Sequence, residues 1–99
     1  MMIAPPRPRR SLPSRRRSVS FNFWHDGLAY HCTASRFPNG RLAEIFLSCA
    51  KAGSTAQQHA ETAAIMASLL LQLRVLSGTV AAAVPGTAVA KAIELAEAP

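Results

Sequence analysis

Residues 35–48 read SRFPNGRLAEIFLS, and this stretch decides the fold of the chain. Residues 37–40 (FPNG) are a turn signal between two runs whose apolar residues fall on alternate positions. Proline presets φ, and an Asn-Gly pair tolerates the left-handed region of the backbone. Alternating apolar and polar residues are typical of strands buried on one side. The stretch therefore predicts a β-hairpin whose strands cover about 28–36 and 41–49.

A second turn signal precedes the first strand of that hairpin. Asp26-Gly27 lies between an alternating run at about 19–24 and the strand at 28–36. An Asp-Gly pair in this setting indicates a tight two-residue turn with positive φ at the glycine. The three strands are therefore expected to form an antiparallel meander.

The two turns also set the expected register of the strands. A two-residue Asp-Gly turn places Phe21 opposite Cys32. A two-residue second turn at 38–39 places Cys32 opposite Ile45, and Glu44 beside Thr33. Moving this turn one residue along the chain shifts the second set of pairs by two residues. The assignment of side chains to faces is the same in both cases, because the period of a strand is two.

This register divides the strand residues between two faces. One face is almost wholly apolar and is expected to lie on a core, whereas the other is mainly polar and faces water or a partner. The apolar face holds Val19, Phe21, Phe23, Leu28, Tyr30, Cys32, Ala34, Ala43, Ile45, Leu47 and Cys49. The other face carries Ser20, Asn22, Trp24, His31, Thr33, Ser35, Leu42, Glu44, Phe46 and Ser48.

After the third strand the periodicity becomes helical, and a helix is expected over about 55–76. Ser54 is placed to cap its start, and Gln57, three residues later, completes a capping box. A stripe of small and aliphatic residues lets the helix lie close to the sheet. The stripe consists of Ala56, Ala60, Ala63, Ala64, Ala67, Leu70 and Leu71.

The second half of this helix is apolar almost all round, so its remaining apolar residues need another cover. The best candidate is a shorter C-terminal helix at about 87–98, which follows a Pro-Gly break, with a short helical turn at 77–84 before it. If they stay exposed, they would drive homo-oligomerisation. These residues are Ile65, Met66, Leu69, Leu73 and Leu76.

Composition divides the chain into two parts. Residues 1–17 combine prolines with arginines and contain no acid, so they are expected to be a disordered basic arm. Residues 18–99 are expected to form one small, nearly neutral α+β domain, a three-stranded antiparallel meander packed on one face by a long helix and a shorter C-terminal helix. The arginines of the arm match the formal charge of +6 of the whole chain, and they are Arg7, Arg9, Arg10, Arg15, Arg16 and Arg17.

Cys32 and Cys49 are too few for a disulfide scaffold and lack the spacing of a metal site, so a reducing, cytoplasmic compartment is expected. Both fall on the apolar face, which favours inert buried thiols over a nucleophile or a disulfide. No secretory signal is visible. Arg74 divides the apolar stretch at 63–90, and Gly and Pro break its second part. A buried helix is therefore favoured over a membrane span.

The mainly polar sheet face is the first candidate binding surface. Aromatic residues there could stack on a nucleobase or a partner side chain, and a histidine diagonal to a carboxylate could grip a polar ligand. The alternatives are an ordinary solvated sheet, or a core contact if the C-terminal helix packs on this face. No catalytic constellation, metal-ligand set or cofactor motif is visible, so no enzyme activity is assigned to this chain by itself. The candidate residues are Asn22, Trp24, His31, Thr33, Glu44 and Phe46.

A second candidate site lies where the third strand joins the helix. Free amides at a helix N-terminus beside a lysine can receive an anion, and Lys51, Gly53 and Ser54 provide this setting. No Walker or dinucleotide glycine pattern surrounds them. A simple capped helix start is the alternative interpretation.

Residues 35–48, preceded by FNFWHDGLAYHCTA (21–34) and followed by KAGS (51–54) and an alanine-rich helix, resemble the TSCPD-type domain. That domain forms the C-terminal region of some adenosylcobalamin-dependent ribonucleotide reductases and also occurs in small stand-alone proteins. The resemblance covers about 16–73. The Thr-Ser-Cys-Pro-Asp run of the family is absent, and the segment from 75 onward departs from it, so no metal or redox role is carried over.

The resemblance implies an accessory or regulatory domain that binds another protein, with a ribonucleotide reductase large subunit as the implied partner. It does not imply ribonucleotide reduction, which needs a large barrel with radical-forming and dithiol cysteines. The residues themselves leave another hypothesis open. In it, the arm neutralises phosphates weakly and without sequence preference, while the aromatic sheet face stacks on bases.

Overall fold

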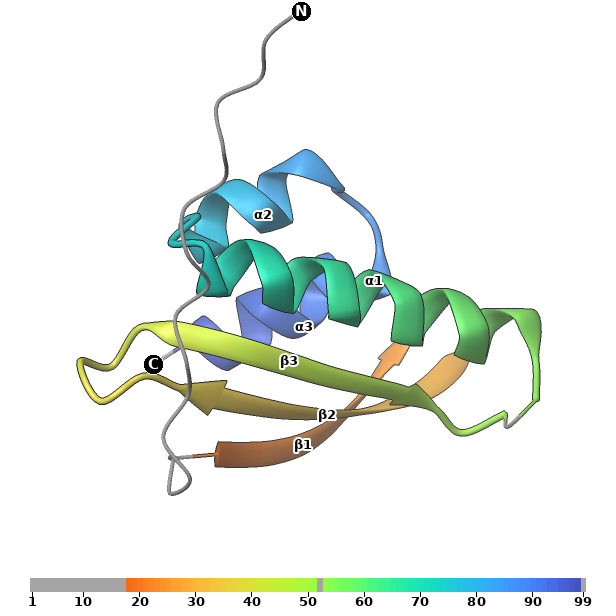
Figure 1. The fold of residues 1–99 in the computed structure, drawn as a ribbon. Helices are drawn as coiled ribbons and strands as arrows, with labels where there is room; N and C mark the ends of the chain where they lie inside the picture. The colour runs from red at the N-terminus through yellow and green to blue at the C-terminus, as the bar shows by residue number, and fades with distance from the viewer. Residues whose placement is uncertain (1–17, 52, 99) are drawn as a thin grey trace, which may run out of the picture.

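The computed structural model describes residues 18–51 and 53–98. Within these ranges three strands are followed by three helices (Figure 1). The strands are β1 (Ser18–His25), β2 (Leu28–Arg36) and β3 (Leu42–Cys49), and the helices are α1 (Thr55–Gln72), α2 (Ser77–Ala83) and α3 (Ala88–Glu97). The α+β fold class and the antiparallel meander expected from the sequence are thereby confirmed. The basic arm lies outside the described residues.

The strands pair in the order β1-β2-β3, and the first hairpin has the expected register. Phe21 lies opposite Cys32, and the backbone of the turn has positive φ at both Asp26 (49°) and Gly27 (75°). This is the combination that a tight hairpin between right-twisted strands requires.

The register of the second hairpin differs by two residues from the one that a turn at 38–39 predicts. Cys32 lies opposite Leu47 rather than Ile45, although the turn itself is at 38–39, where the Gly40 N–H donates to the Phe37 carbonyl at 2.9 Å. Gly40 is an extra loop residue, and it shifts the pairs by one position. A register irregularity between Ser35 and Arg36 then disturbs the alternation next to the turn. As a result Leu42, assigned to the polar face, is buried together with its neighbour Ala43.

The long helix α1 begins and ends in recognisable caps. The Ser54 hydroxyl accepts a hydrogen bond from the Gln57 N–H at 3.1 Å, as a capping residue should. The helix ends at Gln72 rather than at 76, because Arg74 adopts a left-handed backbone conformation with φ of 72°. The expected C-terminal helix is present as α3, and the expected short turn before it is α2.

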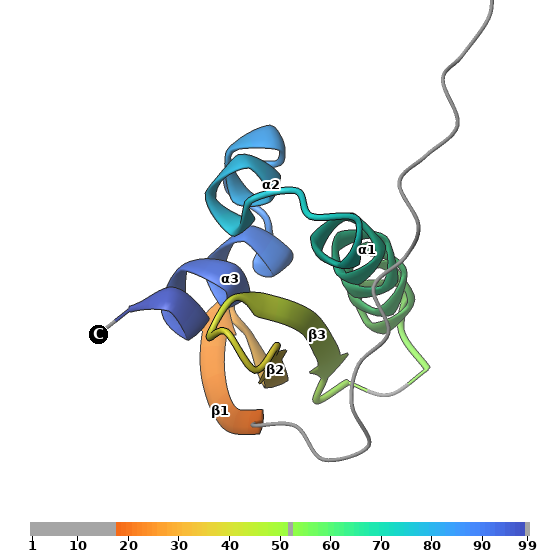
Figure 2. The ribbon, with the colours of Figure 1, turned by 60° about the vertical axis from the view of Figure 1, so that its left-hand side comes forward.

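The helices cover the apolar face of the sheet in an uneven way. Helix α1 packs along β3, α3 contacts both outer strands, and α2 lies on α3, away from the sheet (Figure 2). The core between them contains the apolar side chains of all three strands and the inner faces of the helices. Its largest fully buried side chains are Leu47, Leu71, Ile93, Gln72 and Cys32.

Polar side chains of α1 satisfy the outward-facing backbone of the edge strand β3. The Ser68 hydroxyl accepts a hydrogen bond from the Ile45 N–H (2.9 Å) and donates one to the Ile45 carbonyl (3.0 Å). Gln72 Nε2 donates to the Ala43 carbonyl at 3.2 Å. These bonds replace the ladder that a further strand would supply, so α1 closes this edge against pairing with another chain.

Gln57 extends the same edge closure at the other end of β3. Its side-chain oxygen accepts a hydrogen bond from the Cys49 N–H, and its amide nitrogen donates to Glu61. The capping box expected from the sequence is therefore wrong in its second half. The Gln57 side chain bonds to the strand edge instead, because an unpaired backbone N–H at this edge would cost free energy.

Arg36, at the end of β2, holds the end of α3 in place. Its guanidinium lies 2.8 Å from the Glu97 carboxylate and donates to the Ala96 carbonyl at 2.6 Å. A cation at the C-terminal end of a helix is favoured by the helix dipole. The other Glu97 oxygen accepts from the Ser77 hydroxyl at 2.7 Å, so the same carboxylate also joins α2 to α3.

Candidate functional site

The sheet face opposite the helices carries all the residues expected on the first candidate surface. Asn22 and Trp24 lie on β1, His31 and Thr33 on β2, and Glu44 and Phe46 on β3. The pairing across β2 and β3 differs from the expected one. Glu44 lies opposite Ser35, and Phe46 lies opposite Thr33, because the loop between these strands holds three residues, 38–40, and the register shifts again between Ser35 and Arg36.

Two side-chain pairs between β1 and β2 organise the polar part of this face. His31 Nδ1 lies 2.6 Å from Asn22 Oδ1, and the Ser20 and Thr33 hydroxyl oxygens are 2.9 Å apart. An amide oxygen can only accept, so His31 carries its proton on Nδ1 in this contact. Cross-strand pairs of this kind are what a solvated sheet normally displays.

The two aromatic residues of this face lie too far apart to act on one small group. Trp24 is 68% exposed and Phe46 is 58% exposed. Their partners on β2 are Ala29 and Thr33, four positions apart, and the two aromatic residues lie on opposite outer strands. At the usual strand dimensions this is about 13 Å along the sheet and about 10 Å across it. A ligand that touches both must therefore be extended.

A group of exposed apolar side chains gathers where β3 meets α1. We call Phe46, Ile65, Met66, Leu69 and Leu70 the β3–α1 surface, and each of these side chains is at least 40% exposed. The sequence predicts that the C-terminal helix covers the off-stripe residues of α1, and this is wrong. Helix α3 contacts α1 as well as β1 and β3, but Ile65, Met66 and Leu69 stay exposed on the outer side of α1.

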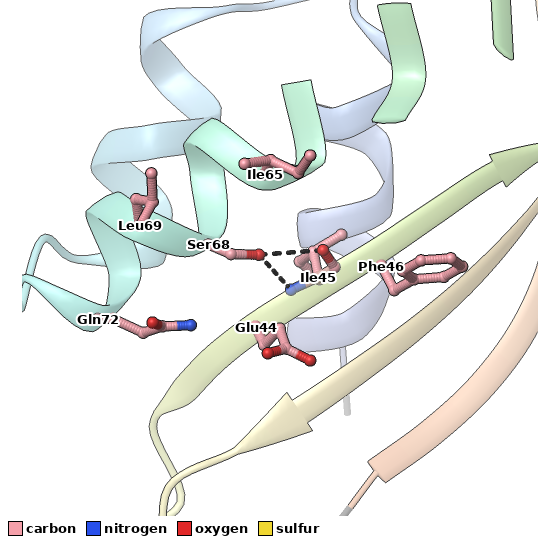
Figure 3. Close-up of a pocket in the computed structure, with 7 residues that line it drawn as sticks. All are labelled: Glu44, Ile45, Phe46, Ile65, Ser68, Leu69 and Gln72. Atoms are coloured by element: carbon pink, nitrogen blue, oxygen red, sulfur yellow. Dashed lines mark hydrogen bonds between the residues drawn. The ribbon is translucent and has the colours of Figure 1, made fainter. Parts of the chain in front are cut away.

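A shallow cavity of about 300 Å³ lies within this surface. Figure 3 shows Ile65, Ser68 and Leu69 on α1 and Glu44 and Phe46 on β3, with Ser68 reaching across to bond with Ile45 on the strand. The cavity therefore has aliphatic and aromatic walls and a carboxylate at its rim. Sequence reasoning missed this site, although the excess of apolar residues on α1 was its signal.

The second candidate, at the start of α1, is organised as a helix cap. Lys51 and Gly53 are exposed, whereas Ser54 is half-buried. The Ser54 hydroxyl donates to the Lys51 carbonyl at 2.6 Å while it accepts from the Gln57 N–H. One helix amide and the only hydroxyl of the group are thus already paired, and anion binding here stays a prediction.

The two cysteines are free and buried, as expected. The corrected register brings them closer along the sheet, because Cys49 lies opposite Tyr30, two positions from Cys32 rather than four. Burial raises the pKa of the Cys32 thiol from its ordinary 9.0 to about 11, so this group stays protonated at neutral pH. A protonated buried thiol is a poor nucleophile.

The raised pKa of Cys32 predicts a loss of stability in alkaline solution. Between pH 9 and pH 11 the unfolded thiol loses its proton while the folded thiol keeps it, so the free energy of unfolding should fall as pH rises. Urea titrations across this range measure the effect. The slope should be shallower in Cys32→Ala, but not zero, since desolvation also raises the pKa of Tyr30. An unchanged slope would contradict the assignment to Cys32.

No helix among the described residues is long and apolar enough to cross a membrane, and those residues contain no cluster of three or more potential metal-ligating side chains. Comparisons with protein-family models, curated proteins and solved structures found no match to this chain.

Proposed function

We propose that this chain is a non-catalytic protein-interaction module that binds its partner through the β3–α1 surface. The observation that carries the proposal is the shallow cavity between β3 and α1, whose lining includes three exposed apolar side chains, Phe46, Ile65 and Leu69. Contiguous apolar patches of this kind mark interaction surfaces on small proteins. The edge of β3 is already closed by Ser68 and Gln72, so a partner would contact side chains rather than add a strand.

The chemistry of the described side chains supports binding over catalysis. Cys32 stays protonated, and His31 is engaged with an amide oxygen on the open sheet face. Nucleophilic catalysis needs an activated nucleophile next to a base, and the described residues place no histidine against either cysteine. The β3–α1 surface offers apolar contact, which suits recognition of aliphatic or aromatic anchors.

The resemblance to the TSCPD-type domain makes a ribonucleotide reductase large subunit the partner to test first. In this proposal the module occupies a surface of the large subunit as an accessory or regulatory domain, and the catalytic cysteines belong to that subunit. The partner is expected to offer apolar side chains to Ile65 and Phe46.

The double variant Ile65→Ser/Met66→Ser should weaken binding to the purified large subunit at least tenfold, because two exposed anchors lose their apolar contact area. Biolayer interferometry with the immobilised full chain measures this. Leu76→Ser is the matched control, since Leu76 is equally exposed but lies beyond the end of α1. Equal affinities for the double variant and the control would refute the role of the β3–α1 surface.

Nucleic-acid binding is the second candidate, and the 68% exposure of Trp24 is the observation that favours it. Trp24 is the sole tryptophan, so its fluorescence reports directly on stacking. Titration with a single-stranded oligothymidylate should quench it, and replacing the six arginines of the arm by alanine should flatten the salt dependence. Unchanged fluorescence at low salt would eliminate this candidate.

A further inference from the structure

A second cavity lies beside the β1–β2 turn. It is open to solvent and is lined by the β1–β2 hairpin, the first half of α1, the loop between α2 and α3 and the start of α3, and its volume is about 470 Å³. Figure 1 shows this loop descending beside α1 toward the start of α3. Pockets that hold small molecules usually measure about 300–1,000 Å³. We call this space the Tyr30 cleft.

The cleft is hollow because, apart from the exposed His59, α1 contributes only methyl groups to it. Ala56, Ala60 and Ala63 line one wall, while Leu28 and Val89 form apolar walls on the sheet and on α3. A helix that packs on a sheet through larger side chains would fill this space. The walls are therefore apolar and close to neutral.

Tyr30 supplies a polar group that the described residues leave unused. The residue is only 7% exposed, and its ring stacks on Phe23 with centroids 5.5 Å apart. Within the described residues its hydroxyl has no hydrogen-bond partner, yet the oxygen is not sealed from the outside. A buried tyrosine hydroxyl normally finds a partner, so this one is available to a molecule in the cleft.

The other polar groups at the cleft limit the charge of what it can hold. Desolvation raises the pKa of Tyr30, so the phenol stays protonated and able to donate at neutral pH. The Thr87 hydroxyl is already used, since it donates to the Val84 carbonyl and accepts from the Ala90 N–H. Asp26, beside His25 at the rim, disfavours anions.

We propose that the Tyr30 cleft binds a small, neutral ring compound that carries one hydrogen-bond acceptor. The ring lies against the alanines of α1, and the acceptor receives the Tyr30 hydroxyl proton in a hydrogen bond. The histidine rings of His25 and His59 border the opening and contribute flat surfaces to it. This site is independent of the β3–α1 surface, with which it shares no residue.

Acetophenone and isopropylbenzene are suitable probes, because they have similar shapes and only the first has an acceptor. In ¹H–¹⁵N NMR spectra of the full chain, acetophenone should cause saturable shifts in the amides of 56–63 and 88–89. Tyr30→Phe should weaken acetophenone binding about three- to tenfold, as expected for one lost hydrogen bond, and leave isopropylbenzene unchanged. Shifts that do not saturate, or equal weakening of both probes, would overturn the proposal.

Filling the cleft is the second test. Ala56→Leu adds a side chain at a partly exposed helix position and should abolish binding of both probes, and Ala63→Leu serves if the first variant folds poorly. Phe46→Ala, on the other surface, should leave both probes bound as in the parent chain. Full binding to a folded Ala56→Leu variant would refute this location. Because the reductase experiment uses different residues, either proposal can fail alone.

Discussion

Ile93→Ala is expected to lower the free energy of unfolding by about 2–5 kcal/mol, the largest effect of any variant considered for this chain. Ile93 lies in α3, is only 1% exposed, and belongs to the core beneath the sheet. Its truncation removes buried apolar area and leaves a cavity that the neighbouring strands can fill only in part. Urea unfolding followed by circular dichroism measures the change.

Leu95→Ala is the matched control for this experiment. Leu95 lies in the same helix but is 42% exposed, so its truncation should cost less than about 1 kcal/mol. Equal losses for the two variants would mean that α3 does not pack with Ile93 inward. The pair thus tests whether the C-terminal segment, which departs from the resembled family, forms part of the core.

Ser68→Ala is expected to cost about 1–3 kcal/mol, because it leaves two buried backbone groups without partners. The Ser68 hydroxyl bonds to both the N–H and the carbonyl of Ile45, and the residue is buried between α1 and β3. Alanine has nearly the same size, so the loss reports on hydrogen bonding more than on packing. Urea unfolding measures stability, and amide hydrogen exchange at Ile45 should accelerate.

Ser20→Ala supplies the comparison for the Ser68 variant. The Ser20 hydroxyl makes a single side-chain hydrogen bond, to Thr33. This bond lies on the exposed sheet face, where water can replace it. The expected loss is within about 0.5 kcal/mol. If Ser68→Ala proved as mild as Ser20→Ala, the closure of the β3 edge by α1 would contribute little to stability.

The register of the second hairpin is a feature that the local sequence pattern does not determine. A turn at 38–39 and a turn at 39–40 place the same side chains on the same faces, so the alternating pattern alone does not separate them. The structure keeps the turn at 38–39, and the extra loop residue Gly40 together with an irregularity between Ser35 and Arg36 shifts the pairs by two residues. One consequence is the burial of Leu42, and another is that Phe46, not Glu44, lies opposite Thr33.

The buried side of α1 is a second feature that the sequence pattern predicts only in part. Its alanine positions were predicted correctly, with Ala60, Ala64 and Ala67 buried, but Leu70 is exposed while Ser68 and Gln72 are buried. An apolar stripe predicts a helix lying on the flat of a sheet. Because α1 runs along the edge of β3, the positions that meet the strand need hydrogen-bonding groups instead.

The sequence by itself determined the strands, the first hairpin, the two faces of the sheet and the capped start of α1. These features depend on local backbone preferences and on the period of apolar residues, which neighbouring residues encode. Only the tertiary structure decided that α1 closes the β3 edge, that Ile65 and its neighbours stay exposed, and that Tyr30 borders a cleft. These features depend on where each helix rests against the sheet. That position is set by packing between residues distant in the chain, and no local pattern specifies it.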